Sequence, residues 1–116
     1  MSAGVSRFTG HAALFDRADR VGDVFRRGAF AGVSSVPLLR DHRGVAIGTV
    51  AVREDERGLH VEGSAEGVTI GDGLSVGFRP RRVAQGGRRE ILLAELIEVS
   101  LVRVPMQPLA RVEQVN

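Results

Sequence analysis

The chain has 116 residues, a length that suits one domain with a single hydrophobic core. It has no cysteine, which excludes disulfide bridges and thiolate zinc sites, and its three histidines are too scattered to suggest a metal cage. All 16 basic residues are arginine, so the calculated pI is 10.8 although the formal net charge is only +2. No segment approaches the roughly 20 apolar residues of a membrane span. We therefore expect one soluble cytoplasmic domain over residues 1–116.

Glycine is plentiful and helical periodicity is scarce, whereas short apolar runs separated by turn residues recur, which predicts a mainly β fold with little helix. In chain order, the predicted strands are Ser6–Leu14, Val36–Asp41, Val45–Arg53, Leu59–Ala65, Leu74–Val83, Glu90–Val104 and a terminal segment at Leu109–Val115. One short helical turn is expected within Gly28–Val33, and hairpin turns at Glu54–Gly58 and Ala84–Gly87. About six to seven strands would form a small closed or partly closed β-barrel, because closure removes exposed sheet edges.

Two charged clusters have simple interpretations. The acidic residues Asp16, Asp19 and Asp23 lack the spacing of a calcium-binding loop, so we interpret them as loop acids with local capping roles. Five arginines between positions 79 and 89 flank a predicted hairpin turn and would suit phosphate or acidic-peptide contact, but they fit a solvated hairpin better.

A hydroxyl of possible catalytic use lies in the run G-L-S-V-G-F, Gly73–Phe78. The run matches the G-x-S-x-G pattern of α/β-hydrolases, but a strand-like segment ending at Pro80 follows it in place of a helix, and the chain is too short for that fold. Alternation places Ser75 and Gly77 opposite the apolar side chains of the run. The flanking glycines would leave room for a substrate backbone to approach the Ser75 hydroxyl.

A carboxylate lies in the strongly apolar segment Glu90–Val104. Alternation places Glu98 among aliphatic side chains on one face of this strand and Glu95 on the other, and both faces are apolar enough to be covered. An unpaired buried carboxylate costs about several kcal/mol, so Glu98 needs a partner, and histidine is the natural one.

Among the histidines, His42 follows the apolar run L-L-R-D and would place its imidazole at a strand end, where a turn residue is the simpler interpretation. His11 and His60 lie within alternating strands and are expected to be structural or solvent-facing. A hydroxyl, an imidazole and a carboxylate are the three groups that an acyl-transfer site needs. They could converge only if the predicted sheet curls back on itself, and that arrangement would be a serine peptidase on a small barrel.

Several ordered blocks of the chain resemble one known family, the prohead maturation proteases of tailed bacteriophages and gene transfer agents, which are relatives of the herpesvirus assemblins. The resemblance runs from about Phe8 to Val112 and includes F-T-G-H-A-A-L-F-D, G-D-V-F-R-R-G-A-F, P-L-L-R-D-H, G-L-H-V-E-G, G-L-S-V-G-F and L-I-E-V-S-L-V-R-V-P. It implies a serine endopeptidase on a herpesvirus-protease-like β-barrel. Such an enzyme cuts capsid or scaffold protein extensions inside the procapsid and often cuts itself.

By motif, the resemblance implies catalytic roles for Ser75 as nucleophile, His42 as general base and Glu98 as the third member of a triad. It implies no cofactor and no metal, and by analogy it suggests backbone amides near Arg79–Arg82 as oxyanion donors. The implied partner is the major capsid protein or a scaffold segment, as protein substrate. A homodimer is a further expectation, whereas a membrane or nucleic-acid partner is not. The implied location is the cytoplasm of the bacterial host, inside the assembling procapsid.

Two other functions stay open at the level of sequence. The segment between Gly63 and Ser75 is shorter than the family usually carries, which motivates a first alternative, a catalytically inactive relative acting as a capsid-assembly or scaffold protein. The second alternative is an arginine-rich barrel that binds nucleic acid. It is the weaker one, because the chain has no tyrosine or tryptophan and only five phenylalanines for base stacking.

Overall fold

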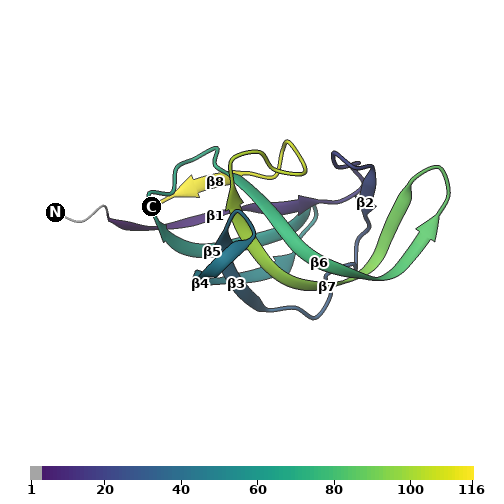
Figure 1. Ribbon diagram of the computed structural model, residues 1–116, viewed down its shortest axis with the longest axis horizontal. Helices are drawn as coiled ribbons and strands as arrows, with labels where there is room; N and C mark the ends of the chain where they lie inside the picture. The colour runs from purple at the N-terminus through teal and green to yellow at the C-terminus, as the bar shows by residue number, and fades with distance from the viewer. Residues whose placement is uncertain (1–3) are drawn as a thin grey trace.

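The computed structural model describes residues 4–116, and within them every regular element is a β-strand (Figure 1). The strands are β1 Val5–Leu14, β2 Asp23–Phe25, β3 Ser35–Arg40, β4 Arg43–Glu54, β5 Gly58–Glu66, β6 Gly73–Gln85, β7 Arg89–Val102 and β8 Val112–Val115. The prediction of a mainly β fold is confirmed, and only β2 was missed. The helical turn expected within Gly28–Val33 is replaced by consecutive hydrogen-bonded turns.

All eight strands belong to one sheet in the order β2-β7-β3-β4-β5-β1-β8, with β6 paired to β7. Strand β7 is central because it has partners on both edges. Antiparallel β6 pairs with it from Gln85↔Arg89 to Gly73↔Val102, whereas β2 and β3 pair in parallel with its opposite ends. The β6–β7 hairpin crosses the molecule, and its tip lies at the end remote from both chain termini (Figure 1).

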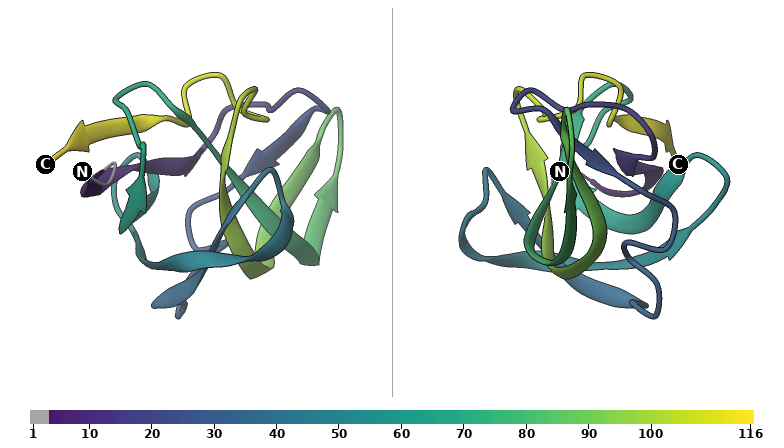
Figure 2. Two further views of the ribbon diagram at one scale, coloured as in Figure 1. Left: turned by 60° about the vertical axis from the view of Figure 1, so that its left-hand side comes forward. Right: turned by 90° about the vertical axis from the view of Figure 1, so that its right-hand side faces the viewer.

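The sheet curls, so that the beginning of β6 approaches the segment leading into β8 (Figure 2). The Leu74 amide donates to the Ala110 carbonyl at 2.9 Å, and the Val112 amide donates to the Asp72 carbonyl at 2.8 Å. Gly73 and Arg111 form an isolated bridge here and not a ladder. Within residues 4–116 the sheet is therefore not closed into a barrel by a ladder of hydrogen bonds, although its two ends meet at this bridge.

The hydrophobic core lies on the concave side of the curled sheet, where Phe25 packs against Phe30 and Phe78 at ring-centroid distances of 5.0 and 4.9 Å. On β7 the alternation holds, since Leu96 is buried on the core face. The expectation that the second face would also be covered is wrong in the middle of the strand. Leu93 and Ile97 are 38% and 42% exposed there.

The imidazole of His11 is buried away from strand β7. His11 on β1 has a side chain only 4% exposed, and its Nδ1 and Nε2 atoms each lie 2.7 Å from a carboxylate oxygen, of Glu113 and Asp55 respectively. These contacts join β1 to β8 and to the β4–β5 turn. The His60 ring packs edge-on against it with a centroid distance of 5.5 Å. The arrangement fits the structural role expected for both residues.

The Asp55 carboxylate accepts more hydrogen bonds than Glu113, the other acid that contacts His11. Burial by itself would raise the pKa of Asp55, but the hydrogen bond to His11 and those from the Arg57 and Gly58 amides lower that pKa to about 2. Because the pKa in the folded state lies below the ordinary value of 3.8, the ionised carboxylate stabilises the fold at pH values above about 4. That contribution is lost as the pH falls from about 4 towards 2.

We therefore expect Asp55→Asn to lower the free energy of unfolding at pH 7 by about 1.5–3 kcal/mol, the range for a hydrogen bond to a charged group. The loss of wild-type stability between about pH 4 and pH 2 should be shallower in the variant. Urea denaturation at several pH values measures both effects. If the free energy of unfolding changes with pH in the same way in both proteins, Asp55 is not responsible for this pH dependence.

Candidate active site

The imidazole of His42 is presented by the tight turn between β3 and β4. Arg40 pairs with Arg43, so Asp41 and His42 form a two-residue loop, and both have positive φ, 53° and 60°. Two-residue hairpin turns of type I′ require this backbone at both central positions. The left-handed conformation costs about 1–2 kcal/mol for a residue other than glycine. The turn must therefore be held by the rest of the fold.

Strand β7 provides the contacts that hold the turn. The Asp41 amide donates to the Leu101 carbonyl at 3.0 Å, and the His42 amide donates to the Ser100 hydroxyl at 3.0 Å. The first contact extends the parallel pairing of β3 with β7, in which Arg40 lies opposite Leu101, and the second adds a side-chain contact from the same strand. The imidazole is thereby fixed above the part of β7 that carries Glu98.

Glu98 and His42 are in direct contact. The Glu98 side chain is only 12% exposed, and its Oε2 atom lies 2.7 Å from His42 Nδ1. Its Oε1 atom accepts a hydrogen bond of 2.8 Å from the Ser100 hydroxyl. Both oxygens of the buried carboxylate therefore have partners, as the sequence predicted for Glu98. Since a carboxylate accepts, Nδ1 carries a proton, and in the neutral imidazole Nε2 is then the acceptor.

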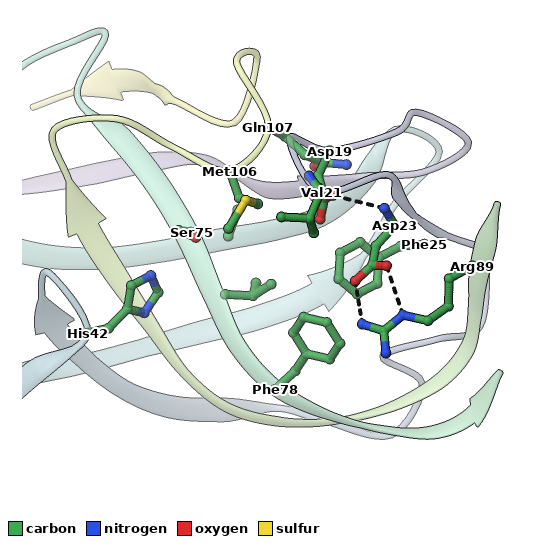
Figure 3. Close-up of a pocket in the computed structure, with 12 residues that line it drawn as sticks. Asp19, Val21, Asp23, Phe25, His42, Ser75, Phe78, Arg89, Met106 and Gln107 are labelled. Carbon is green, nitrogen blue, oxygen red and sulfur yellow. Dashed lines mark hydrogen bonds and ion pairs between the residues drawn. The ribbon is translucent and has the colours of Figure 1, made fainter.

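Ser75 lies on the neighbouring strand, directly opposite Ser100 in the β6–β7 ladder. Its side chain is buried, with the residue 6% exposed, and it lines the same cavity as His42 (Figure 3). Among the hydrogen bonds of residues 4–116, none joins the Ser75 hydroxyl to the imidazole. The three predicted residues thus share one region, with the His42–Glu98 contact formed and the Ser75–His42 contact not formed in this state.

Gly77 is needed for the position of the Glu98 carboxylate. The two residues are cross-strand partners, and a Cβ atom built on Gly77 would overlap Glu98 Oε2 and lie 2.7 Å from Glu98 Cδ. The space at Gly73 is likewise occupied, by the Val102 carbonyl oxygen and by Pro105. The interpretation that these glycines leave room for a substrate is therefore wrong, because the protein itself fills the space.

Two residues of the site were missed as functional. Ser100 had a usable signal, because alternation places it on the same face as Glu98 and two residues away. Its links to the His42 amide and to Glu98 depend on the β3–β7 pairing, which is not local in sequence. The only sequence signal for Gly77 was its position in the G-x-S-x-G pattern.

The other polar groups singled out in the sequence lie elsewhere. Arg79–Arg82 continue along β6, so their amides begin about 13 Å from Ser75 at ~3.3 Å per residue, which removes the analogy with an oxyanion loop. Asp19 accepts hydrogen bonds from the Val21 and Asp23 amides, as expected of a loop acid. Asp23 itself forms an ion pair with Arg89, at 2.6 Å.

Residues 4–116 contain no cluster of three or more histidine and acidic side chains suited to holding a metal ion. The same residues include no helix long and apolar enough to cross a membrane.

The structure thus contains a buried carboxylate in contact with Nδ1 of an imidazole, and a serine that lines the same cavity as that imidazole. Comparison with known families gives the class: residues 2–116 match the caudovirus prohead serine proteases, and the chain belongs to this family. No curated protein and no solved structure matches the chain. Membership makes the protein a serine protease of capsid maturation in tailed phages, which acts in the procapsid on capsid protein.

We expect Gly77→Ala to lower the rate of substrate cleavage about a hundredfold or more, because the new methyl group displaces the Glu98 carboxylate from His42. Gly87→Ala is the matched control, since nothing lies within 4 Å of a Cβ there. It should cleave at close to the wild-type rate. Rates measured on one capsid substrate, with thermal melts alongside, decide the matter. Wild-type cleavage by Gly77→Ala would show that the position of Glu98 is unimportant.

Proposed function

We propose that this chain is an endopeptidase that cuts extensions from capsid or scaffold protein during procapsid maturation, with Ser75 as nucleophile, His42 as general base and Glu98 as the residue that orients the base. The observation that carries the proposal is the 2.7 Å contact between Glu98 Oε2 and His42 Nδ1, made beside a cavity that Ser75 also lines. Self-cleavage is part of the proposal by family resemblance.

In the proposed reaction, Nε2 of His42 takes the proton of the Ser75 hydroxyl as Oγ attacks the scissile carbonyl carbon. Glu98 keeps the proton on Nδ1 and stabilises the imidazolium that forms. His42 then returns a proton to the leaving amine, and the acyl group stays on Oγ. Water next attacks the ester with His42 again as base, which releases the acid and restores Ser75. The Ser75–His42 hydrogen bond forms when substrate binds, since such contacts are often long in free enzymes.

The cavity beside Ser75 keeps its walls although the segment before Ser75 is short. Residues 67–72 connect β5 to β6 through a turn in which the Thr69 amide donates to Asp72 at 2.8 Å. The wall of the cavity opposite β6 comes instead from the 19–23 loop and from Met106 and Gln107. Buried Gln107 fixes that wall by hydrogen bonds with the backbone of Leu14. These contacts favour an active enzyme over an inactive assembly protein.

The substrate and the location of the reaction are proposed from the family resemblance. The substrate is the major capsid protein, a scaffold segment or both, and the reaction takes place in the cytoplasm of the bacterial host. The homodimer expected from the sequence stays a prediction.

Ser75→Ala should abolish cleavage of the capsid precursor and also the labelling of the protein by a fluorophosphonate, because both reactions need the Oγ nucleophile. The melting temperature should stay close to the wild-type value, since removal of one hydroxyl opens no large cavity. Co-expression with the capsid protein, followed by electrophoresis and mass spectrometry, provides the measurement. Normal processing by Ser75→Ala, or a wild-type protein that never reacts with the probe beside its capsid protein, would reject the proposed function.

Glu98→Gln should lower the cleavage rate steeply, on the order of 10⁴-fold, because an amide in place of Oε2 favours the wrong imidazole tautomer. Its effect on stability should be much smaller, since the buried amide still forms hydrogen bonds. Glu95→Gln is the internal control, because Glu95 is exposed on the other face of β7 and pairs with Arg81. It should cleave within a few-fold of wild type. Equal losses from the two variants, or unfolding without a specific loss of rate, would assign Glu98 a structural role only.

A further inference from the structure

The cavity that Ser75 lines continues along the edge of β6 that faces away from β7. Ser75 and Val76 both line it although their side chains point to opposite faces of the strand, so the cavity lies at the strand edge. It extends past Phe78 to the Asp23–Arg89 ion pair (Figure 3). One end therefore lies at the nucleophile and the other at β2 and the turn end of the β6–β7 hairpin.

The wall between these two ends is apolar. The apolar lining residues are Val76 and Phe78 of β6, Phe25 of β2, and Ala12, Val21 and Met106. The Phe25 and Phe78 rings of this wall pack edge to face at a centroid distance of 4.9 Å. A substrate group that fills the cavity must be apolar along most of its length.

The polar groups at the far end already have partners. Both Asp23 oxygens accept from Arg89, at 2.8 and 2.6 Å, and the Asp23 side chain is only 8% exposed. The Asp19 Oδ1 atom accepts from the Val21 and Asp23 amides at 3.0 and 2.9 Å. A lysine or arginine side chain would have to bury its charge along the apolar wall and compete with Arg89 for Asp23, which disfavours a basic group.

The size of the cavity indicates what it holds. Its volume is about 210 Å³, below the roughly 300–1,000 Å³ of small-molecule pockets. A single amino-acid side chain suits this volume better than a cofactor or a metabolite.

We propose that this cavity binds the side chain of the substrate residue whose carbonyl Ser75 attacks, and that it selects a large apolar residue such as leucine, methionine or phenylalanine. The assignment rests on the proposed function of Ser75. It follows because the side chain nearest to the attacked carbonyl is the one that reaches a cavity beginning at the nucleophile.

The selection is tested by exposing the wild-type protein to a peptide library derived from a bacterial proteome and reading the cut sites by mass spectrometry. Leucine, methionine and phenylalanine before the cut bond should be favoured over alanine by about tenfold or more, the discrimination that a hydrophobic pocket gives per methylene. Lysine and arginine should be disfavoured. A preference for a basic, acidic or very small residue at this position would overturn the proposal.

A matched pair of variants tests the location of the pocket. Val76→Phe narrows the cavity and should shift the preference towards alanine by about tenfold. Val45→Phe makes the same change at a side chain that is 88% exposed on β4, outside the cavity, and should leave the profile unchanged. An unchanged profile in folded Val76→Phe would overturn the assignment, and if that variant does not fold, the wild-type profile decides alone.

Labelling by a small fluorophosphonate separates this proposal from the one it rests on. The probe needs the Ser75 nucleophile but not a side chain in the cavity. Labelling together with the wrong cleavage profile rejects the pocket and leaves the serine assignment standing. Neither labelling nor cleavage by the wild-type protein rejects both.

Discussion

Strand β7 is the element on which the remaining structure depends, because it has hydrogen-bonded neighbours along both edges. Its pairing with β6 sets Ser75 opposite Ser100 and Gly77 opposite Glu98. Its parallel pairing with β3 on the other edge brings the Asp41–His42 turn to the same level of the strand. Glu98, Ser100 and His42 come into contact, with Ser75 on the adjacent strand, because one strand sets the register of both neighbours. A one-residue slip of either neighbour would turn its side chains to the other face.

The same region contains a strained turn that the rest of the fold must hold in place. Asp41 and His42 occupy backbone conformations that glycine would adopt without strain. The turn persists because β7 supplies hydrogen bonds to both backbone amides, from Leu101 and Ser100. A histidine at this position directs its ring back towards Glu98, and a glycine would have no ring to direct.

The chain contains two histidine–carboxylate arrangements, and the differences between them support a structural role for His11 and the proposed catalytic role for His42. His11 is almost fully buried, and both of its ring nitrogens contact carboxylates, so neither nitrogen is free to take a proton from a substrate. His42 has a side chain 40% exposed, uses Nδ1 for Glu98 and lines a cavity with Ser75. A buried ion cluster joins strands, whereas a half-exposed imidazole with one oriented nitrogen suits a general base.

Much of this protein follows from its sequence alone, because alternation along a strand is a local property. The period-two pattern predicted the strands other than β2 and also placed Glu98 on a buried face and Glu95 on the opposite one. Burial then required a partner for Glu98. What local pattern does not contain is which strands become neighbours. The three-residue strand β2, the contact of Ser100 with His42, the filling of the space at Gly77 and the cavity between β6 and β2 all arise from pairings between segments distant in the chain. Tertiary structure decided these features, because hydrogen bonds between strands are specified by the register of the whole sheet and not by the residues of either strand.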